Sequence, residues 1–388
     1  MWFHRKGNTI QGIAFDCGTS GVRAALFSFL QKDVLTKPDV SEIIRIPFAP
    51  AAYMDARQLK QKTREGIREV IKKLSSSFHP HEIMVGFSSP FYVSKTIRVS
   101  HPRQDPRLPI TNEESQALAA EAMRTFEEEA EKRIADRTVV TFTAMPLKTY
   151  VNGYRVSNPV GMAGKLLEAS FRFEATKSNV FDDFKKLFAQ HYERAAFRVA
   201  SVALANFQAL RAIYGNEQGF LIIDMGAEVT EIGLTIDGAL EQVTSLPLGH
   251  MVFIREMAAL LGISLVDASF IASRYAEQTL ESGKAKQLGP LIAEFQDTWR
   301  KKLFTILTAY AQHHEIPTHV FFTGGGVLPF HKDIFLEDAF RPLFYGKNPM
   351  PELLAPDTLD HQFGKHMFQS PSDFALASLT LLGARTVV

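Results

Sequence analysis

Two stretches of the chain share one pattern of apolar and polar positions. Residues 12–29 (GIAFDCGTSGVRAALFSF) and 220–240 (FLIIDMGAEVTEIGLTIDGAL) each predict an apolar strand, a turn that begins at an Asp, and a second strand. A Leu follows the Asp by ten positions in both stretches, at Leu26 and Leu234. Because repeated supersecondary units are typical of duplicated architectures, this pattern predicts two related halves that face each other.

The region between these stretches predicts a small α+β unit. Three prolines indicate a loop over 101–110, and the series that starts at Thr111 has the form of a capping box, which predicts a long helix. Strands follow, with a tight turn at Asn152-Gly153. We expect this unit to span residues 88–176 and to interrupt the first half.

Elsewhere the pattern predicts mainly helices. The expected elements are an amphipathic helix over 53–78, strands over 81–100, helices over 179–214 and 252–315, a buried strand over 319–330 that runs into a glycine triplet, and a closing helix at the C-terminal end. Together these elements place the chain in the α/β class.

The composition is that of an ordinary globular protein. The 388 residues are 46% hydrophobic, and 43 Lys and Arg balance 42 Asp and Glu, which gives no electrostatic footprint for nucleic acid. A single cysteine, Cys17, excludes an internal disulfide and a cysteine metal cluster. No stretch approaches the ~20 apolar residues of a membrane span. We therefore expect a soluble protein of a reducing compartment with more than one packed core.

The turns of both repeated units are suited to phosphate. Glycine permits positive φ and lets another group approach the backbone, and a turn with several exposed N–H groups forms an anion site. An Asp at a strand end can hold Mg²⁺ through water, so Asp16 and Asp224 are the expected metal ligands. Two such turns would hold a polyphosphate from both sides, and a third glycine-rich turn would give backbone access to a nucleoside. The expected nucleotide-binding residues are Asp16, Gly18, Thr19, Ser20, Asp224, Gly226, Ala227, Gly324, Gly325 and Gly326.

The order and spacing of these three turns resemble the phosphate-1, phosphate-2 and adenosine motifs of the actin-like ATPase superfamily. Within it, residues 152–169 (NGYRVSNPVGMAGKLLEA) are similar to the NP-[LV]-G-[ML]-x-G-x-x-[LM]-E run of the FtsA family of bacterial cell-division proteins. Residues 16–23 (DCGTSGVR) fit better the D-x-G-[ST]-S-x-V-K motif of the related PilM family, which has the same extra domain. The longer match favours FtsA.

The resemblance implies an α/β, two-lobed actin-like ATPase fold with an inserted small α+β subdomain in the first lobe and the nucleotide between the lobes. The implied division assigns residues 1–87, 177–209 and 371–388 to the first lobe, 88–176 to the inserted subdomain, 210–251 and 316–370 to the second lobe, and 252–315 to a helical subdomain of the second lobe.

Several positions depart from the FtsA pattern. Glu228 replaces a glycine near the expected γ-phosphate, so its carboxylate would repel phosphate unless it turns away or is offset by a metal. Residues 201–205 lack the acid or amide that positions water in hydrolysing relatives, so we expect nucleotide binding and at most a slow ATPase. The helix expected near the ribose and adenine falls near residues 294–304, and its residues 294–302 are more basic than in the family. FtsA's C-terminal amphipathic helix has no counterpart, so we expect membrane contact to be indirect, or weak through residues 1–6.

The resemblance also implies a function. An FtsA-like protein binds ATP, polymerises, and links the FtsZ ring to the membrane and to other division proteins at the inner, cytoplasmic face of the cell membrane. Residues 252–315 are then the candidate surface for the FtsZ C-terminal peptide. The alternative is a PilM-like cytoplasmic adaptor of type IV pilus assembly, which binds a pilus protein's peptide between the first lobe and the insert. A small-molecule kinase is disfavoured, because no acid suited to accept a substrate hydroxyl proton is found.

Overall fold

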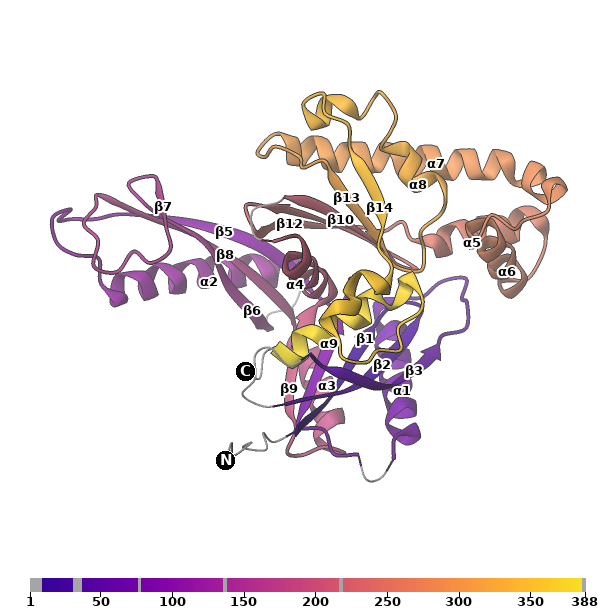
Figure 1. The fold of residues 1–388 in the computed structure, drawn as a ribbon, viewed down its shortest axis with the longest axis horizontal. Helices are drawn as coiled ribbons and strands as arrows, with labels where there is room; N and C mark the ends of the chain where they lie inside the picture. The colour runs from indigo at the N-terminus through magenta and orange to yellow at the C-terminus, as the bar shows by residue number, and fades with distance from the viewer. Residues whose placement is uncertain (1–8, 31–36, 76–77, 135–137, 216–218, 386–388) are drawn as a thin grey trace, which may run out of the picture.

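The computed structural model describes residues 9–30, 37–75, 78–134, 138–215 and 219–385, whose strands form three sheets (Figure 1). Two five-stranded sheets build two lobes, and a four-stranded sheet projects to one side of them. Residues 1–6, considered above for membrane contact, lie outside the described residues. Within the described chain, no helix is long and apolar enough to cross a membrane.

The first sheet builds the first lobe. Its strands and the helices around it are β1 (Thr9–Cys17), β2 (Gly21–Leu30), β3 (Asp39–Pro47), α1 (Ala56–Lys73), β4 (Glu82–Phe87), α3 (Ser178–Ala189), β9 (Ala196–Ser201), α4 (Val202–Tyr214) and α9 (Phe374–Arg385). The strand order is β3-β2-β1-β4-β9, and the β1–β2 hairpin places Asp16 opposite Arg23. Because side chains alternate along a strand, Phe15 packs with α1 and α3, whereas Ala14 packs with α4 and α9.

The second sheet repeats this plan in the second lobe. Its strands and helices are β10 (Phe220–Met225), β11 (Thr230–Ile236), β12 (Ala239–Leu246), α5 (His250–Leu261), α6 (Leu265–Ala276), α7 (Ser282–Ala311), β13 (His319–Thr323), α8 (Phe330–Ile334) and β14 (Met350–Leu353). A 3-10 helix, η1 (Arg341–Phe344), lies between α8 and β14, and two more, η2 (Pro356–Gln362) and η3 (Pro371–Asp373), lie between β14 and α9. The strand order is β12-β11-β10-β13-β14, and Asp224 lies opposite Glu231, as Asp16 lies opposite Arg23. The sequence repeat therefore corresponds to two equivalent hairpins.

One hydrophobic core crosses from lobe to lobe. On one face of the second sheet, Ile223 packs with α5 and α7 around the buried Trp299. On the other face, Ile222 and Phe321 pack with α4 and α9, the same helices that cover the first sheet. Burying these apolar faces against shared helices joins the two sheets in one packing unit.

The third sheet lies in the insert. Its elements are β5 (Val93–Pro102), α2 (Asn112–Ile134), β6 (Val139–Val151), β7 (Tyr154–Val156) and β8 (Leu166–Lys177), and the strand order is β5-β8-β6-β7. The helix α2 covers one face, where Phe126 packs on Phe173. The predicted capping box is confirmed, because the N–H of Glu114 donates to Thr111 Oγ1 at 3.2 Å and the N–H of Thr111 donates to Glu114 Oε2 at 2.9 Å. The subdomain boundaries given above stay predictions.

One element differs from the sequence prediction. Residues 179–214 are predicted to be helical throughout, but residues 196–201 form β9, the edge strand that runs parallel to β4. Phe197 and Val199 face the core, and Arg198 on the outer face forms an ion pair with Glu82 at 3.0 Å. A six-residue strand buried mainly on one face is too short to stand out between the amphipathic helix α3 and the almost fully buried helix α4.

Candidate functional site

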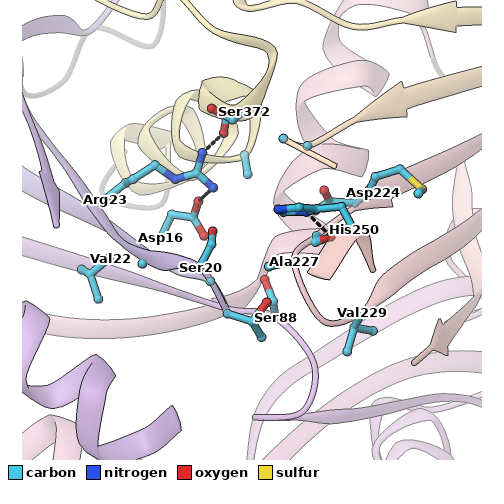
Figure 2. Close-up of a pocket in the computed structure, with 18 of the residues that line it drawn as sticks. Asp16, Ser20, Val22, Arg23, Ser88, Asp224, Ala227, Val229, His250 and Ser372 are labelled. Atoms are coloured by element: carbon cyan, nitrogen blue, oxygen red, sulfur yellow. Dashed lines mark hydrogen bonds and ion pairs between the residues drawn. The ribbon is translucent and has the colours of Figure 1, made fainter. Parts of the chain in front are cut away.

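The three glycine-rich turns predicted from the sequence meet in a cleft between the lobes (Figure 2). The space that they enclose, called here the cleft pocket, has a volume of about 340 Å³. The expected residues that line it are Asp16, Gly18, Thr19, Ser20, Asp224, Gly226, Ala227, Gly324 and Gly325. Gly326 lies behind this wall, where its N–H donates to the carbonyl oxygen of Met225 at 2.9 Å.

The two phosphate-type turns contain the same local hydrogen bond. The N–H of Gly18 donates to the carbonyl oxygen of Gly21 at 3.1 Å, and the N–H of Gly226 donates to that of Val229 at 3.0 Å. A Cβ atom on Gly226 would lie 2.7 Å from the Val229 oxygen, so this turn requires glycine. The repeated sequence pattern thus produces a repeated turn geometry.

The third turn packs directly against the second. Gly324 has a φ of +93°, and a Cβ atom there would lie 2.6 Å from Oδ1 of Asp224. Strand β13 pairs with β10 so that Thr323 lies beside Asp224. The absence of a side chain at Gly324 therefore lets the end of β13 approach this carboxylate.

The two expected metal ligands are carboxylates from opposite lobes, Asp16 buried and Asp224 partly buried. Asp16 forms an ion pair with Arg23 at 2.8 Å, and Arg23 also donates to the carbonyl oxygen of Ser372 (Figure 2). Burial raises the pKa of Asp16, and Arg23 opposes this effect. Burial also raises the pKa of Asp224 to about 6, with a contribution from the charge of Asp16. A divalent cation here would offset the cost of ionising both groups.

The site fits Mg²⁺ held through water. In the part of the chain that is described, no three His, Cys, Asp or Glu side chains form a group that could hold a metal ion. Two carboxylates alone leave most of an octahedral shell to waters and phosphate oxygens, which is how Mg²⁺ is usually bound in nucleotide sites. The geometry agrees with the expected role of Asp16 and Asp224, which stays a proposal.

Glu228 is neutralised by a side chain from the same lobe. Its carboxylate forms an ion pair with Arg255 on α5, and Arg255 Nε also donates to the carbonyl oxygen of Ala51 in the first lobe at 3.1 Å. The backbone N–H of Glu228 donates to Thr19 Oγ1 at 3.1 Å, across the cleft. The repulsion expected from this carboxylate is therefore offset by an arginine, whereas the sequence suggested only a rotation or a metal.

A second cavity of about 480 Å³ adjoins the cleft pocket. The two share Thr19, Ser20, Ala227, His250, Gly325 and Ser372. One side of its wall comes from α5 and α6, including Met251, Ile254 and Ala272, and the first-lobe segment 48–51 forms another side. An apolar wall with a few polar groups suits the base and ribose of a nucleoside.

The helix expected near the ribose and adenine does not line these cavities. It falls near residues 294–304, all of them described, and none of these residues lines either cavity. Asp297 instead forms ion pairs with Arg300 and Lys301 on α7, and Arg300 also approaches Glu337 at 3.5 Å. The basic stretch is therefore largely neutralised by local acids.

Other cleft residues were not predicted as site residues. Arg23 and Glu231 hold equivalent positions, because each lies seven residues after the Asp of its hairpin and directly opposite it. The register of the predicted hairpins could therefore have indicated both residues. His250 Nδ1 lies 3.1 Å from the carbonyl oxygen of Gly226, and burial lowers its pKa. Ser88 follows β4 and carries no sequence signal of its own.

The helix that would offer a water-positioning group contains no acid at its start. Ser201 caps α4, where its Oγ accepts from the N–H of Leu204 at 3.0 Å and donates to Glu174 at 2.8 Å. Residues 202–205 are apolar and buried. These side chains stabilise the helix start and supply no base toward the cleft.

Known proteins share the overall architecture of this chain. No protein-family model matches the chain. The solved PilM-PilN type IV pilus biogenesis complex contains a similar chain, with a TM-score of 0.63 and 16% identity over 96% of this chain and 98% of that one. The protein has the actin-like ATPase fold. At this identity, the structural likeness establishes the fold and no more.

The sequence of this actin-like protein also resembles FtsA in part. The cell division proteins FtsA of two Helicobacter pylori strains are 21% and 20% identical to it over 143 and 144 residues. The match covers 36% of this chain and 28% of the length of those relatives. The chain therefore has the actin-like ATPase fold and a partial sequence likeness to FtsA, which does not decide between an FtsA-like and a PilM-like role.

Proposed function

We propose that the protein binds ATP with Mg²⁺ between its lobes and acts as a nucleotide-dependent protein scaffold. The observation that supports this most is the pair of equivalent turns, one from each lobe, that contribute Asp16 and Asp224 to one pocket. The adjoining cavity on α5 and α6 offers space for the nucleoside. Gly325 lines both spaces, and Gly324 beside it lines the cleft pocket.

Binding without efficient turnover is the expected chemistry. The start of α4 offers no acid or amide to orient an attacking water, and general base catalysis needs such a group within hydrogen-bond reach. We propose at most slow hydrolysis. The backbone turns, Asp16 and Asp224 would orient the phosphates and the cation, whose charge would stabilise the phosphate oxygens.

ATP titration of the purified full chain, by calorimetry with Mg²⁺ present, tests this proposal. Asp16→Asn keeps the side-chain shape but removes the charge, and we expect it to weaken binding by at least about tenfold. Asp338→Ala removes an exposed carboxylate far from the cleft and is the matched control. If the wild type does not bind ATP, the proposed function is contradicted. If Asp16→Asn binds ATP as tightly as the wild type, the assignment of Asp16 as a metal ligand is contradicted.

The finer proposal is an FtsA-like division protein that self-associates and binds the FtsZ C-terminal peptide through residues 252–315. The partial identity to two FtsA proteins supports it. Within this region, Val266 and Phe270 are 66% and 64% exposed and lie four positions apart on α6. Residues at that spacing share a helix face, and such an apolar face suits a short amphipathic peptide.

A PilM-like adaptor is the second candidate. The likeness to a chain of the PilM-PilN complex, which covers almost the whole of this protein, and the Asp16–Arg23 motif favour it. Labelled peptides from the same genome separate the two: the C-terminal peptide of FtsZ, and the N-terminal peptide of the pilus inner-membrane protein. Binding of the first that is lost in Phe270→Asp supports the division role, and binding of the second alone supports the pilus role. Binding of neither contradicts both.

A further inference from the structure

The segment that leads into the insert is part of the wall of the cleft pocket. It joins the end of β4 at Phe87 to the start of β5 at Val93. Ser88 and Ser89, its first residues, line the pocket together with the turns of both lobes, and Figure 2 shows Ser88 near Ser20 and Ala227. A ligand in the cleft therefore meets the chain at the point where it leaves the first lobe for the insert.

The same segment is bonded to the second lobe. Tyr92, the residue before β5, donates its hydroxyl hydrogen to Glu231 Oε1 at 2.8 Å, and both side chains are buried. Glu231 lies opposite Asp224 in the second phosphate-type hairpin and also lines the pocket. One hydrogen bond thus joins the root of the insert to the hairpin that faces the ligand.

The strand that returns from the insert holds this root in place. Thr176 Oγ1 at the end of β8 donates to the carbonyl oxygen of Phe91 at 2.6 Å. Glu174, on the same strand, accepts from Ser201 Oγ at the start of α4 at 2.8 Å. Both ends of the insert are therefore fixed by buried hydrogen bonds within a few residues of the cleft.

The insert has a further attachment to the second lobe. Lys148 on β6 lies 2.7 Å from Glu241 and 3.2 Å from Asp237, at the β11–β12 end. Thr96 on β5 donates to the carbonyl oxygen of Glu241 at 2.7 Å. Because the insert contacts both lobes, any change in the angle between the lobes must move it or break one of these contacts.

We propose that occupancy of the cleft sets the orientation of the inserted subdomain through residues 88–92, with Tyr92 as the positioning residue. This inference rests on the proposed function, in which the cleft binds ATP. A ligand that displaces the second hairpin carries Glu231 with it, and the Tyr92 bond transmits that displacement to β5. The insert then presents a different surface in the two states.

Two variants separate coupling from simple stabilisation. Tyr92→Phe removes only the hydroxyl and keeps the ring, which packs on Phe142 at a centroid distance of 6.5 Å. Ser245→Ala is the matched control, because Ser245 on β12 also donates to Glu231 Oε1, at 3.4 Å, from within the second lobe. If Tyr92 only stabilised the fold, Tyr92→Phe would change amide exchange in the insert equally with and without ATP.

Hydrogen–deuterium exchange of the full chain, with and without saturating ATP and Mg²⁺, tests the inference. In the wild type we expect ATP to change the exchange rate of amides in β5 and β6 by about tenfold, and in Tyr92→Phe by less than about threefold, while Ser245→Ala keeps the full response. A titration on each sample confirms that ATP is bound. If ATP binds but exchange in the insert does not change, or if Tyr92→Phe responds as the wild type does, the coupling is overturned and the proposed function stands. If the wild type binds no ATP, both the coupling and the proposed function are overturned.

Discussion

Glu228 and Arg255 show that an acidic residue in a phosphate-type turn requires a neighbouring cation. The carboxylate of Glu228 belongs to the second turn, and Arg255 is the cation that offsets it. Both side chains are partly exposed, so solvent weakens the pair. Glu228 lines the adjoining cavity beside the cleft pocket, so the removal of Arg255 would leave its charge unpaired close to a bound phosphate chain.

Arg255→Ala should therefore weaken ATP binding by on the order of tenfold, because an unpaired carboxylate would then face the phosphates. The double variant Glu228→Gly with Arg255→Ala should recover most of the loss, and Glu228→Gly alone should gain little. Calorimetric titration of the three variants measures this, with Arg255→Lys as the charge-conserving control. A double variant as weak as Arg255→Ala would show that Arg255 acts on the ligand directly.

Glu231 gives a prediction for pH. Burial raises its pKa to about 7, hydrogen bonds from Tyr92 and Ser245 oppose the shift, and Asp224 and Glu174 add to it. The folded state then binds more protons than the unfolded state between about pH 4.5 and 7, so its contribution to stability is present at low pH and is lost as the pH rises through about 7.

Glu231→Gln mimics the protonated side chain and should be more stable than the wild type at pH 8, by about 2–3 kcal/mol at most. At pH 4 the two proteins should be nearly equal. Denaturant unfolding at both pH values, without nucleotide or Mg²⁺, provides the comparison. A constant difference at both values would indicate that the carboxyl group does not titrate in this range.

At the scale of elements, the hairpins could be predicted and the contacts between them could not. Local signals, an Asp, a glycine and an alternating strand, indicated both phosphate-type turns and the capping box at Thr111. The strand β9 was missed because it depends on pairing with β4, a partner more than 100 residues away. The partnership of Arg255 with Glu228 was missed for the same reason, since it is set by tertiary packing, whereas the register of the first hairpin could have indicated the pair of Arg23 and Asp16.

Gly249, at the start of α5, illustrates such packing. Its backbone is extended, but a Cβ atom there would lie 2.2 Å from the carbonyl oxygen of Ala227. Gly249→Ala should push the second turn away and lower the free energy of unfolding by about 1–3 kcal/mol. Gly283→Ala in the first turn of α7, where no atom outside the helix backbone and the chain neighbours lies within 4 Å of the added carbon, should instead stabilise the protein by about 0.5 kcal/mol.

Chemical denaturation of these two variants tests whether the turn is tightly packed. ATP titration should show weaker binding for Gly249→Ala and unchanged binding for Gly283→Ala. Equal stability of the two variants would mean that the backbone of the second turn yields easily to an added carbon atom.

At the scale of the whole molecule, the shared core predicts how the lobes unfold. Because α4 and α9 pack against both sheets, the lobes should unfold in one cooperative transition. ATP with Mg²⁺ at a hundredfold excess over Kd should add about 2.7 kcal/mol of stability and raise Tm by a few degrees. Scanning calorimetry measures both effects. Separate transitions of the two lobes, with only one shifted by ATP, would contradict this prediction.

The bond from the N–H of Glu228 to Thr19 Oγ1 has a consequence for affinity. This N–H group already donates to an acceptor from the opposite lobe. A phosphate oxygen that replaces Thr19 Oγ1 therefore contributes only the difference in free energy between a hydrogen bond to an anionic acceptor and one to a neutral acceptor. In return, the two turns are held in register before they meet a ligand, and less orientational freedom is lost when one arrives. The cleft gives up some enthalpy of binding in exchange for preorganisation.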